Sequence, residues 1–188
     1  GLAAAAVPGG GHVMSLRRMN SVTGCSADGE GRYSLTLQPG VILSQLRKGI
    51  EQKKFDTSGW SAESRAALEA LRGAGGYLFP TDPTETSATL GGMTACNASG
   101  ARSFLYGPMR RHVLALRVAL ADGQTLALRR GRVFAKKRSL QLKTEQGSLL
   151  DIPLPTYRMP HVKNASGYFA KDDMDAVDLF IGSDGTLG

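Results

Sequence analysis

The stretch "TLGGMTACNASG" at residues 89–100 sets two adjacent glycines among hydroxyl, thiol and amide side chains. Asp82-Pro83 begins a turn just before it, and the hydroxyls of the segment 84–89 follow. Glycines leave the backbone open to the close approach of a flat or anionic group. Because consecutive backbone N–H groups form an anion-binding concavity that needs no lysine, we expect phosphate or pyrophosphate here. A tight structural turn would use the same residues, and this alternative stays open at this point.

The elements before this stretch are predicted to be a strand and two helices. "YSLTLQ" at 33–38 alternates as a half-buried strand does, and Pro39-Gly40 ends it. An apolar residue then recurs every fourth position, which indicates one stripe of an amphipathic helix formed by Ile42, Leu46 and Ile50. Ser61 can cap a second helix, "AESRAALEALR", and Gly73 stands where a C-terminal glycine is expected.

Two β-hairpins are predicted after it. "VLALRVAL" and "QTLALRR" flank Asp122-Gly123, a strong hairpin signal. "LQLKTEQGSLLDIPL" predicts a second hairpin that turns near Gln146-Gly147. Strands joined by tight turns, with helices between them rather than after every strand, favour an α+β fold over a parallel doubly wound sheet.

Composition narrows the class of protein. A chain of 188 residues with 41% apolar and 6% aromatic residues can form a single domain, with room for subdomains. Its apolar runs are too short to cross a bilayer. Cys25 and Cys96 stand far apart without a CxxC partner, which argues against zinc, an Fe–S cluster or a disulfide framework. We expect no bound metal and a cytoplasmic location, with the inner face of the membrane as the alternative. The first residues do not resemble a signal peptide, and both ends look cut, so we expect a fragment.

Positive charge is concentrated in one segment. The net charge is +7, and residues 129–138 carry six basic side chains and no acid. A solvated loop is the first interpretation of this basic segment, and an anionic or nucleic-acid partner is the second. Phe134 is the single aromatic residue within it, and no familiar nucleic-acid motif accompanies it, so we expect no nucleic acid. The six residues are Arg129, Arg130, Arg132, Lys136, Lys137 and Arg138.

Much of the chain resembles one family. "YLFPTDPTETSATLGGMTACNASGARSFLYGPMRRHVLALRVALADG" (77–123) and "DLFIGSDGTLG" (178–188) closely resemble the FAD-binding domain of vanillyl-alcohol oxidase type flavoproteins. Proline, the double glycine, Asn-x-x-Gly and Tyr-Gly follow in family order and spacing. The nearest branch is similar to the D-lactate, glycolate and D-2-hydroxyglutarate dehydrogenases. Gly1-Leu2 resemble the end of the pyrophosphate loop, and residues 7–20 resemble the strand region after it. "LTLQPGVILSQL" resembles the next strand and helix.

The resemblance implies a two-subdomain PCMH-type FAD-binding fold, α+β in class. Most of the chain would be the second subdomain, with an antiparallel sheet flanked by helices. Residues 1–55 would end the first subdomain, 56–76 would be a helical insertion, and 77–188 would form the second. Within the insertion, we expect Trp60 to be a packing residue. FAD would lie between the subdomains and be bound noncovalently.

The resemblance also assigns residues to the cofactor. The wall beside the ribityl chain and pyrophosphate would comprise Pro80, Asp82, Pro83, Thr84, Thr86, Ala88, Thr89, Gly91 and Gly92. The turn that meets the flavin and its phosphates would comprise Cys96, Asn97, Ala98, Ser99 and Gly100. A late loop on the adenosine or flavin side would comprise Asp184, Gly185, Thr186, Leu187 and Gly188. The family's usual Glu is here Asp184, a side chain that is shorter by one methylene.

The implied reaction is the oxidation of a D-2-hydroxy acid by hydride transfer to flavin N5. The base and the carboxylate-binding Arg would lie on a C-terminal cap domain outside this chain, so no catalytic residue is named and the chain alone should be inactive. The electron acceptor is open. His12, His112 and His161 are isolated in sequence and are expected to be surface or packing residues. A noncatalytic flavin- or anion-binding module and a basic nucleic-acid-binding protein are the alternatives.

Overall fold

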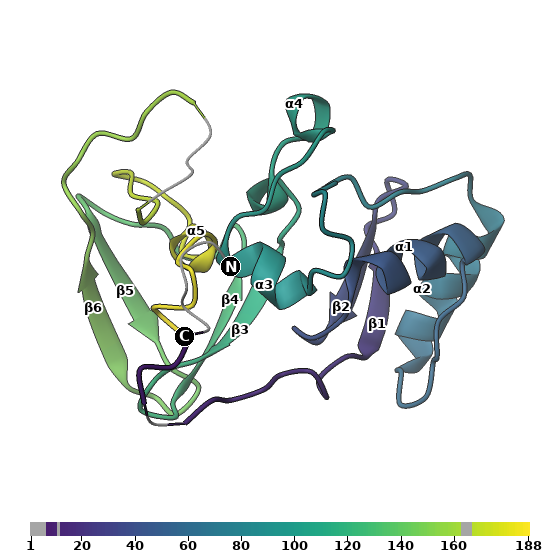
Figure 1. Cartoon of the computed structure of the whole chain (residues 1–188), viewed down its shortest axis with the longest axis horizontal. Helices are drawn as coiled ribbons and strands as arrows, with labels where there is room; N and C mark the ends of the chain where they lie inside the picture. The colour runs from purple at the N-terminus through teal and green to yellow at the C-terminus, as the bar shows by residue number, and fades with distance from the viewer. Residues whose placement is uncertain (1–6, 11, 163–166) are drawn as a thin grey trace.

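The computed structural model describes residues 7–10, 12–162 and 167–188 (Figure 1). The expectation for Gly1-Leu2 therefore lies outside the described residues. Within these ranges the strands form three two-stranded antiparallel sheets, β1–β2, β3–β4 and β5–β6. The mixed α and β class and the antiparallel pairing are confirmed. The expected single sheet is wrong, because each hairpin pairs only with itself.

The first hairpin consists of β1 (Val22–Ala27) and β2 (Tyr33–Leu37), and it confirms the strand expected at 33–38. Helix α1 (Leu43–Gln52) follows the Pro39-Gly40 turn. Ile42 is the residue before the first turn of this helix, and Leu43, Leu46 and Gly49 are its buried residues. The expected helix is therefore confirmed, but its apolar face is rotated from the stripe read off the sequence.

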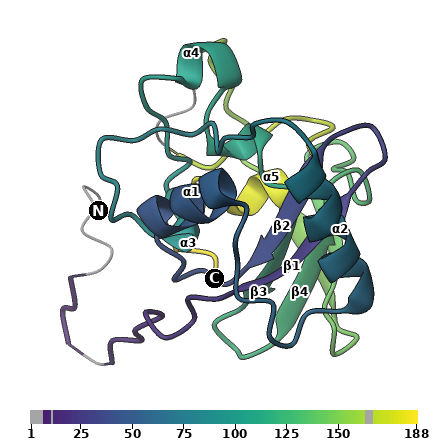
Figure 2. The ribbon, with the colours of Figure 1, turned by 90° about the vertical axis from the view of Figure 1, so that its right-hand side faces the viewer.

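Helix α2 (Ala62–Gly73) packs against β1 (Figure 2). The Ser61 side chain accepts a hydrogen bond from the backbone N–H of Ser64, as the capping signal predicts. Gly73 is the last helical residue, which agrees with its expected place at the C-terminal end, and Ala74 after it is extended. Trp60 is 3% exposed, stacks on Phe55 and donates from Nε1 to the carbonyl of Val22 at 2.9 Å, which confirms a packing role.

Both later hairpins form where the turn residues place them. Strands β3 (Ala115–Ala119) and β4 (Thr125–Arg129) are joined through Gly123, whose φ is +84°. Strands β5 (Ser139–Lys143) and β6 (Leu149–Pro153) are joined through Gly147, whose φ is +98°. Left-handed backbone is the conformation that glycine adopts without steric cost, so these two glycines explain the turns.

The remaining helices are short: α3 (Leu90–Ala95), α4 (Ser103–Tyr106), the 3-10 helix η1 (Met109–Arg111) and α5 (Val177–Phe180). In Figure 1, α3 and α5 lie between the hairpins, and α4 projects at the top. The main core joins α1, α3 and α5 with residues of β4 and β5. Fully buried members include Leu43, Leu126, Leu140 and Val177. A smaller cluster beneath α2 contains Cys25, Trp60, Leu68 and Leu71. No helix among the described residues has the length and apolar character needed to span a bilayer.

The basic segment is solvated only in part. Arg129, Arg132, Lys136 and Lys137 are exposed. Arg138 instead pairs with Asp172 and donates to the carbonyl oxygens of Pro155, Tyr157 and Ala170. Arg130 pairs with the buried Asp178. The interpretation as a solvated loop is therefore wrong for these two arginines, which pair with acidic residues of the fold.

Candidate functional site

The double glycine begins a helix rather than a turn. Helix α3 is six residues long, and the Thr89 hydroxyl caps it by accepting a hydrogen bond from the backbone N–H of Gly92 at 3.2 Å. Leu90 and Met93 anchor the helix in the main core. This anchoring fixes which backbone atoms of the stretch face inward and which face solvent.

Two of the glycines in this stretch are required because other residues of the protein pack too closely for a side chain. A Cβ atom at Gly91 would lie 2.6 Å from the Cβ of Pro39, and one at Gly100 would lie 1.5 Å from the carbonyl oxygen of Asp82. Neither distance is sterically allowed, so packing within the protein accounts for both glycines. Gly92 differs, because it is exposed and a Cβ there would meet only the Thr89 hydroxyl, at 3.1 Å.

Residues 80–88, which precede the glycine-containing stretch 89–100, are hydrogen-bonded to the start of α1. The carbonyl oxygens of Ala88 and Thr86 accept hydrogen bonds from the backbone N–H groups of Leu43 and Ser44, at 2.9 and 3.1 Å, at the start of α1. Thr84 and Thr86 are exposed, while Pro80 and Pro83 are half-buried. This segment therefore combines a fixed backbone with hydroxyl side chains that face solvent.

The Asp82 carboxylate is already held by cations. Arg47 Nη2 lies 2.5 Å from one of its oxygens, and Arg102 Nε lies 3.4 Å from the other. Arg47 also donates to the carbonyl of Thr81. Asp82 thus ties α1 to the residues before α4, and this role accounts for its carboxylate without a ligand.

The turn after α3 is fixed by a left-handed asparagine. Asn97 has a φ of +48° and is 3% exposed, and its Oδ1 accepts a hydrogen bond from the backbone N–H of Arg110 at 3.0 Å. Asparagine tolerates this backbone conformation better than most residues. The neighbouring carbonyl of Ala98 accepts from the Met109 N–H at 2.9 Å. Cys96 is exposed and Ser99 is half-buried on the same turn.

The late loop meets the C-terminal end of α3. Gly182 and Asp184 donate backbone hydrogen bonds of 3.1 and 2.8 Å to the carbonyls of Thr94 and Ala95. Two segments that are more than eighty residues apart in the sequence therefore form one surface. Asp184, Gly185 and Thr186 are exposed on this loop.

The last residues of the loop leave that surface. Leu187 is half-buried in an apolar groove beside β4, β6 and α5. A Cβ at Gly188 would lie 2.4 Å from Val118 Cγ1, so Gly188 lies against β3. The structure thus brings Thr89–Gly100 together with residues 182–186, and it places Leu187 and Gly188 elsewhere.

An arginine pair that the sequence did not single out holds this arrangement. Arg110 Nη1 donates to the carbonyl of Asp178 at 2.5 Å, and its Nη2 donates to the carbonyl of Ile181. Arg110 and Arg130 both bind the Asp178 carboxylate, at 3.2 and 2.9 Å. Burial lowers the pKa of Arg110, and Asp178 opposes this shift. No periodicity or motif could have revealed these contacts, because the partners are far apart in the sequence.

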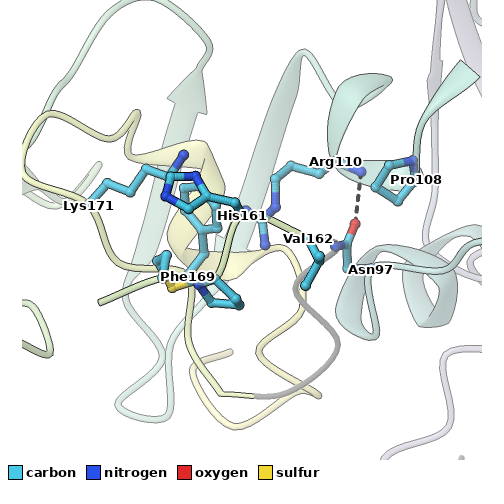
Figure 3. A pocket seen from close by; sticks show the side chains of 9 residues that line it. Asn97, Pro108, Arg110, His161, Val162, Phe169 and Lys171 are labelled. Atoms are coloured by element: carbon cyan, nitrogen blue, oxygen red, sulfur yellow. Dashed lines mark hydrogen bonds between the residues drawn. The ribbon is translucent and has the colours of Figure 1, made fainter. Parts of the chain in front are cut away.

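A cavity of about 330 Å³ opens beside this arginine. Figure 3 shows Asn97 and Pro108 on one side of it and His161, Phe169 and Lys171 on the other, with the Arg110 side chain between them. The Arg110 guanidinium lies 4.2 Å from the centroid of the Phe169 ring. No acidic residue is among the described residues that line the cavity.

Comparisons with known proteins agree on one family. A sequence model described as "FAD binding domain" matches residues 60–129, which include α2 as well as α3 and β3–β4. Comparison with solved structures gave no significant match.

The chain is also similar to several curated proteins. It is 29% identical over 96% of its length to the D-lactate dehydrogenase of Anaerostipes hadrus, covering 25% of that protein. It is 34% identical over 81% of its length to a probable mitochondrial D-lactate dehydrogenase of Danio rerio, covering 25% of that protein. It is 27% identical over 95% of its length to the glycolate oxidase subunit GlcD of Bacillus subtilis, covering 26% of that protein.

The chain spans about a quarter of the length of these relatives. The family match covers the capped helix α3, the turn at Asn97 and the β3–β4 hairpin. The similarity to the relatives extends over nearly the whole chain. Residues 60–129 match the FAD-binding domain family, the chain is similar to FAD-linked oxidases, and FAD is the cofactor that these matches support.

Proposed function

We propose that this chain is the FAD-binding part of a flavin-dependent oxidoreductase that oxidises a D-2-hydroxy acid such as D-lactate or glycolate. The family match and the names of the relatives support this proposal. The proposal includes noncovalent FAD, the two-subdomain arrangement with borders at 55 and 76, and a substrate-binding cap outside the chain.

The observation that carries the proposal is the exposed Gly92. Glycine within a helix costs about 1 kcal/mol relative to alanine, so a helical glycine needs a compensating reason. Packing supplies that reason for Gly91, but it does not for Gly92, whose Cβ position faces solvent except for the Thr89 hydroxyl. A ligand that lies directly on the backbone would supply it.

We propose that FAD lies on the surface formed by Thr89–Gly100 and residues 182–186. The exposed hydroxyls of Thr84 and Thr86 would border its ribityl chain and pyrophosphate. Leu187 and Gly188 would support the late loop from behind, since they face the protein and not this surface. Bound FAD supplies the two-electron acceptor for oxidation of the hydroxy acid. The residues of this chain bind and orient it, and no catalytic residue is assigned to them.

The test compares two substitutions at Gly92 in the longest natural form of the protein that contains this chain. Gly92→Ala should leave the fold as stable as the parent or stabilise it by up to about 1 kcal/mol, because alanine favours the helix. Gly92→Val should abolish FAD binding while the apoprotein stays folded. Flavin absorbance and circular dichroism are measured on the same samples.

Gly91→Ala is the matched control, because its Cβ would clash with Pro39 inside the protein. It should lower the unfolding midpoint before any ligand is added. If Gly92→Val binds FAD as tightly as the parent, the stretch is a plain structural element and the cofactor assignment for residues 80–100 fails.

A further inference from the structure

We propose that the cavity lined by Asn97, Arg110, His161 and Lys171 is an oxyanion-binding site, which takes a carboxylate or a phosphate group. The proposal concerns the charge of this cavity and does not require that FAD lies on the Gly92 surface. Three features of the described residues support it.

The first feature is the buried positive charge of Arg110 at the cavity. Arg110 shares the Asp178 carboxylate with Arg130, whose charge is also balanced by the nearby Asp175. The Arg110 side chain is 13% exposed and the Asp178 side chain is 12% exposed, so water screens this charge poorly. An anion in the cavity would face the Arg110 guanidinium and add to its partial pairing with Asp178.

The second feature is the set of groups that face the cavity. Lys171 and His161 are exposed at its rim, and Lys171 Nζ lies 5.3 Å from the Phe169 centroid. Phe169 therefore contacts Arg110 and Lys171 together, and such cation–π contacts restrain the two cationic side chains. Restrained cations lose less entropy when they bind an anion.

The third feature is the orientation of the Asn97 amide. Its Oδ1 accepts the backbone N–H of Arg110, which leaves the NH₂ group as the donor end of this cavity-lining side chain. The side chains that carry polar groups at the cavity can therefore all donate hydrogen bonds. By contrast, the groove beside Leu187 is lined mainly by apolar residues and offers no such set.

The experiment titrates the chain with inorganic pyrophosphate and, separately, with oxalate by isothermal calorimetry at low ionic strength. We expect saturable binding with one site per chain. Lys171→Gln should weaken binding at least tenfold. The control is Lys143→Gln, which removes the same charge from an exposed position on β5 outside the cavity. It should leave the dissociation constant within about twofold.

Equal weakening by both variants would overturn the proposal, since it would indicate attraction by net charge alone. Absence of saturable binding would overturn it too. His161→Gln is a second variant at the rim, and no change in both rim variants would place any bound anion elsewhere.

Repeating the titrations with saturating FAD separates the two sources of the anionic group. If FAD abolishes pyrophosphate and oxalate binding, the cavity holds a phosphate of the cofactor. If oxalate still binds, the cavity holds the carboxylate of a substrate. Failure of FAD to bind the longest natural form of the protein would contradict the proposed function, while the first titrations judge the oxyanion site.

Discussion

The backbone N–H of Asp184 donates a hydrogen bond of 2.8 Å to the carbonyl oxygen of Ala95, which joins the late loop to the end of α3. Asp184 adopts a φ of +53° in making this bond. The bond therefore depends on a backbone conformation that few side chains accept. Since both segments contribute to the proposed cofactor surface, the geometry of Asp184 affects the fold and the ligand together.

Asp184→Val should destabilise the protein by about 1–2 kcal/mol, because a β-branched residue is unfavourable in left-handed backbone. We expect FAD affinity to fall in parallel. Asp184→Asn is the control, since asparagine accepts this conformation, and it should unfold at the parent's urea concentration. Urea denaturation and FAD titration measure the two effects. A Val variant that matches the parent in both would show that the loop adjusts freely.

Gly100→Ala should be among the most destabilising single-atom additions in the chain. The new Cβ would lie 1.5 Å from the Asp82 carbonyl oxygen, so the backbone must move, and we expect a loss of about 3 kcal/mol. Gly73→Ala at the end of α2 has nothing within 4 Å of its Cβ and should be neutral or stabilising. Comparable unfolding midpoints for the two variants would contradict this packing argument.

Arg138→Ser should lower the free energy of unfolding by about 1.5–3 kcal/mol, the usual worth of hydrogen bonds to a charged group. The lost contacts are those to Asp172 and to the carbonyls of Pro155 and Ala170. Lys136→Ser removes the same charge from the same segment, but Lys136 is exposed, so its effect should stay within about 0.5 kcal/mol. Thermal denaturation of the pair tests whether Arg138 is structural while Lys136 of the same segment is solvated.

Trp60→Phe keeps an aromatic ring beneath α2 and removes the Nε1 hydrogen bond to the Val22 carbonyl. We expect a loss of about 1 kcal/mol, since this is the typical net contribution of one hydrogen bond. Trp60→Ala should lose about 3–5 kcal/mol, because it also leaves a cavity. Urea denaturation followed by far-ultraviolet circular dichroism suits all three proteins, and a Phe variant as unstable as the Ala variant would rule out the packing explanation.

Protein stability should fall as the pH drops below about 6.5, the ordinary pKa of histidine. Burial lowers the pKa of His112 in the folded state, with smaller opposing contributions from backbone hydrogen bonds to Tyr106 and Gly107, and its Nε2 atom is buried without a hydrogen-bond partner among the described residues. The unfolded chain therefore binds a proton at a pH where the folded protein does not, and stability is lost as the pH falls towards the folded pKa. His112→Gln should flatten this dependence below about pH 6.5.

Local signals predicted the elements well where a turn or a cap defines them. Ser61 located the start of α2, and the glycines at 123 and 147 located two hairpins. The phase of α1 was harder, because Ile42 and Leu43 are both apolar and the helix packs on Leu43. The sequence also could not show that the three hairpins stay separate, since strand pairing between hairpins depends on contacts distant in the sequence.

The candidate site was also predicted only where the sequence carries a local signal. The glycines of residues 89–100 indicated a site in the sequence, but the sequence did not distinguish the three glycines from one another. The structure does, because Pro39 lies against Gly91 and the Asp82 carbonyl lies against Gly100. The roles of Arg110 and Arg130 depend on Asp178, which lies 68 and 48 residues away along the chain. Such pairs have no local sequence pattern.

Helix α5 has a consequence for how the protein is made. The buried run Met174–Ile181 packs into the same core as Leu43 of α1 and Leu126 of β4. A ribosome delivers the chain from its N-terminus, so the earlier helices and hairpins emerge while the apolar surface that α5 will cover is still open to solvent. Until residues 174–181 leave the exit tunnel, the nascent chain presents this surface to chaperones and to other nascent chains.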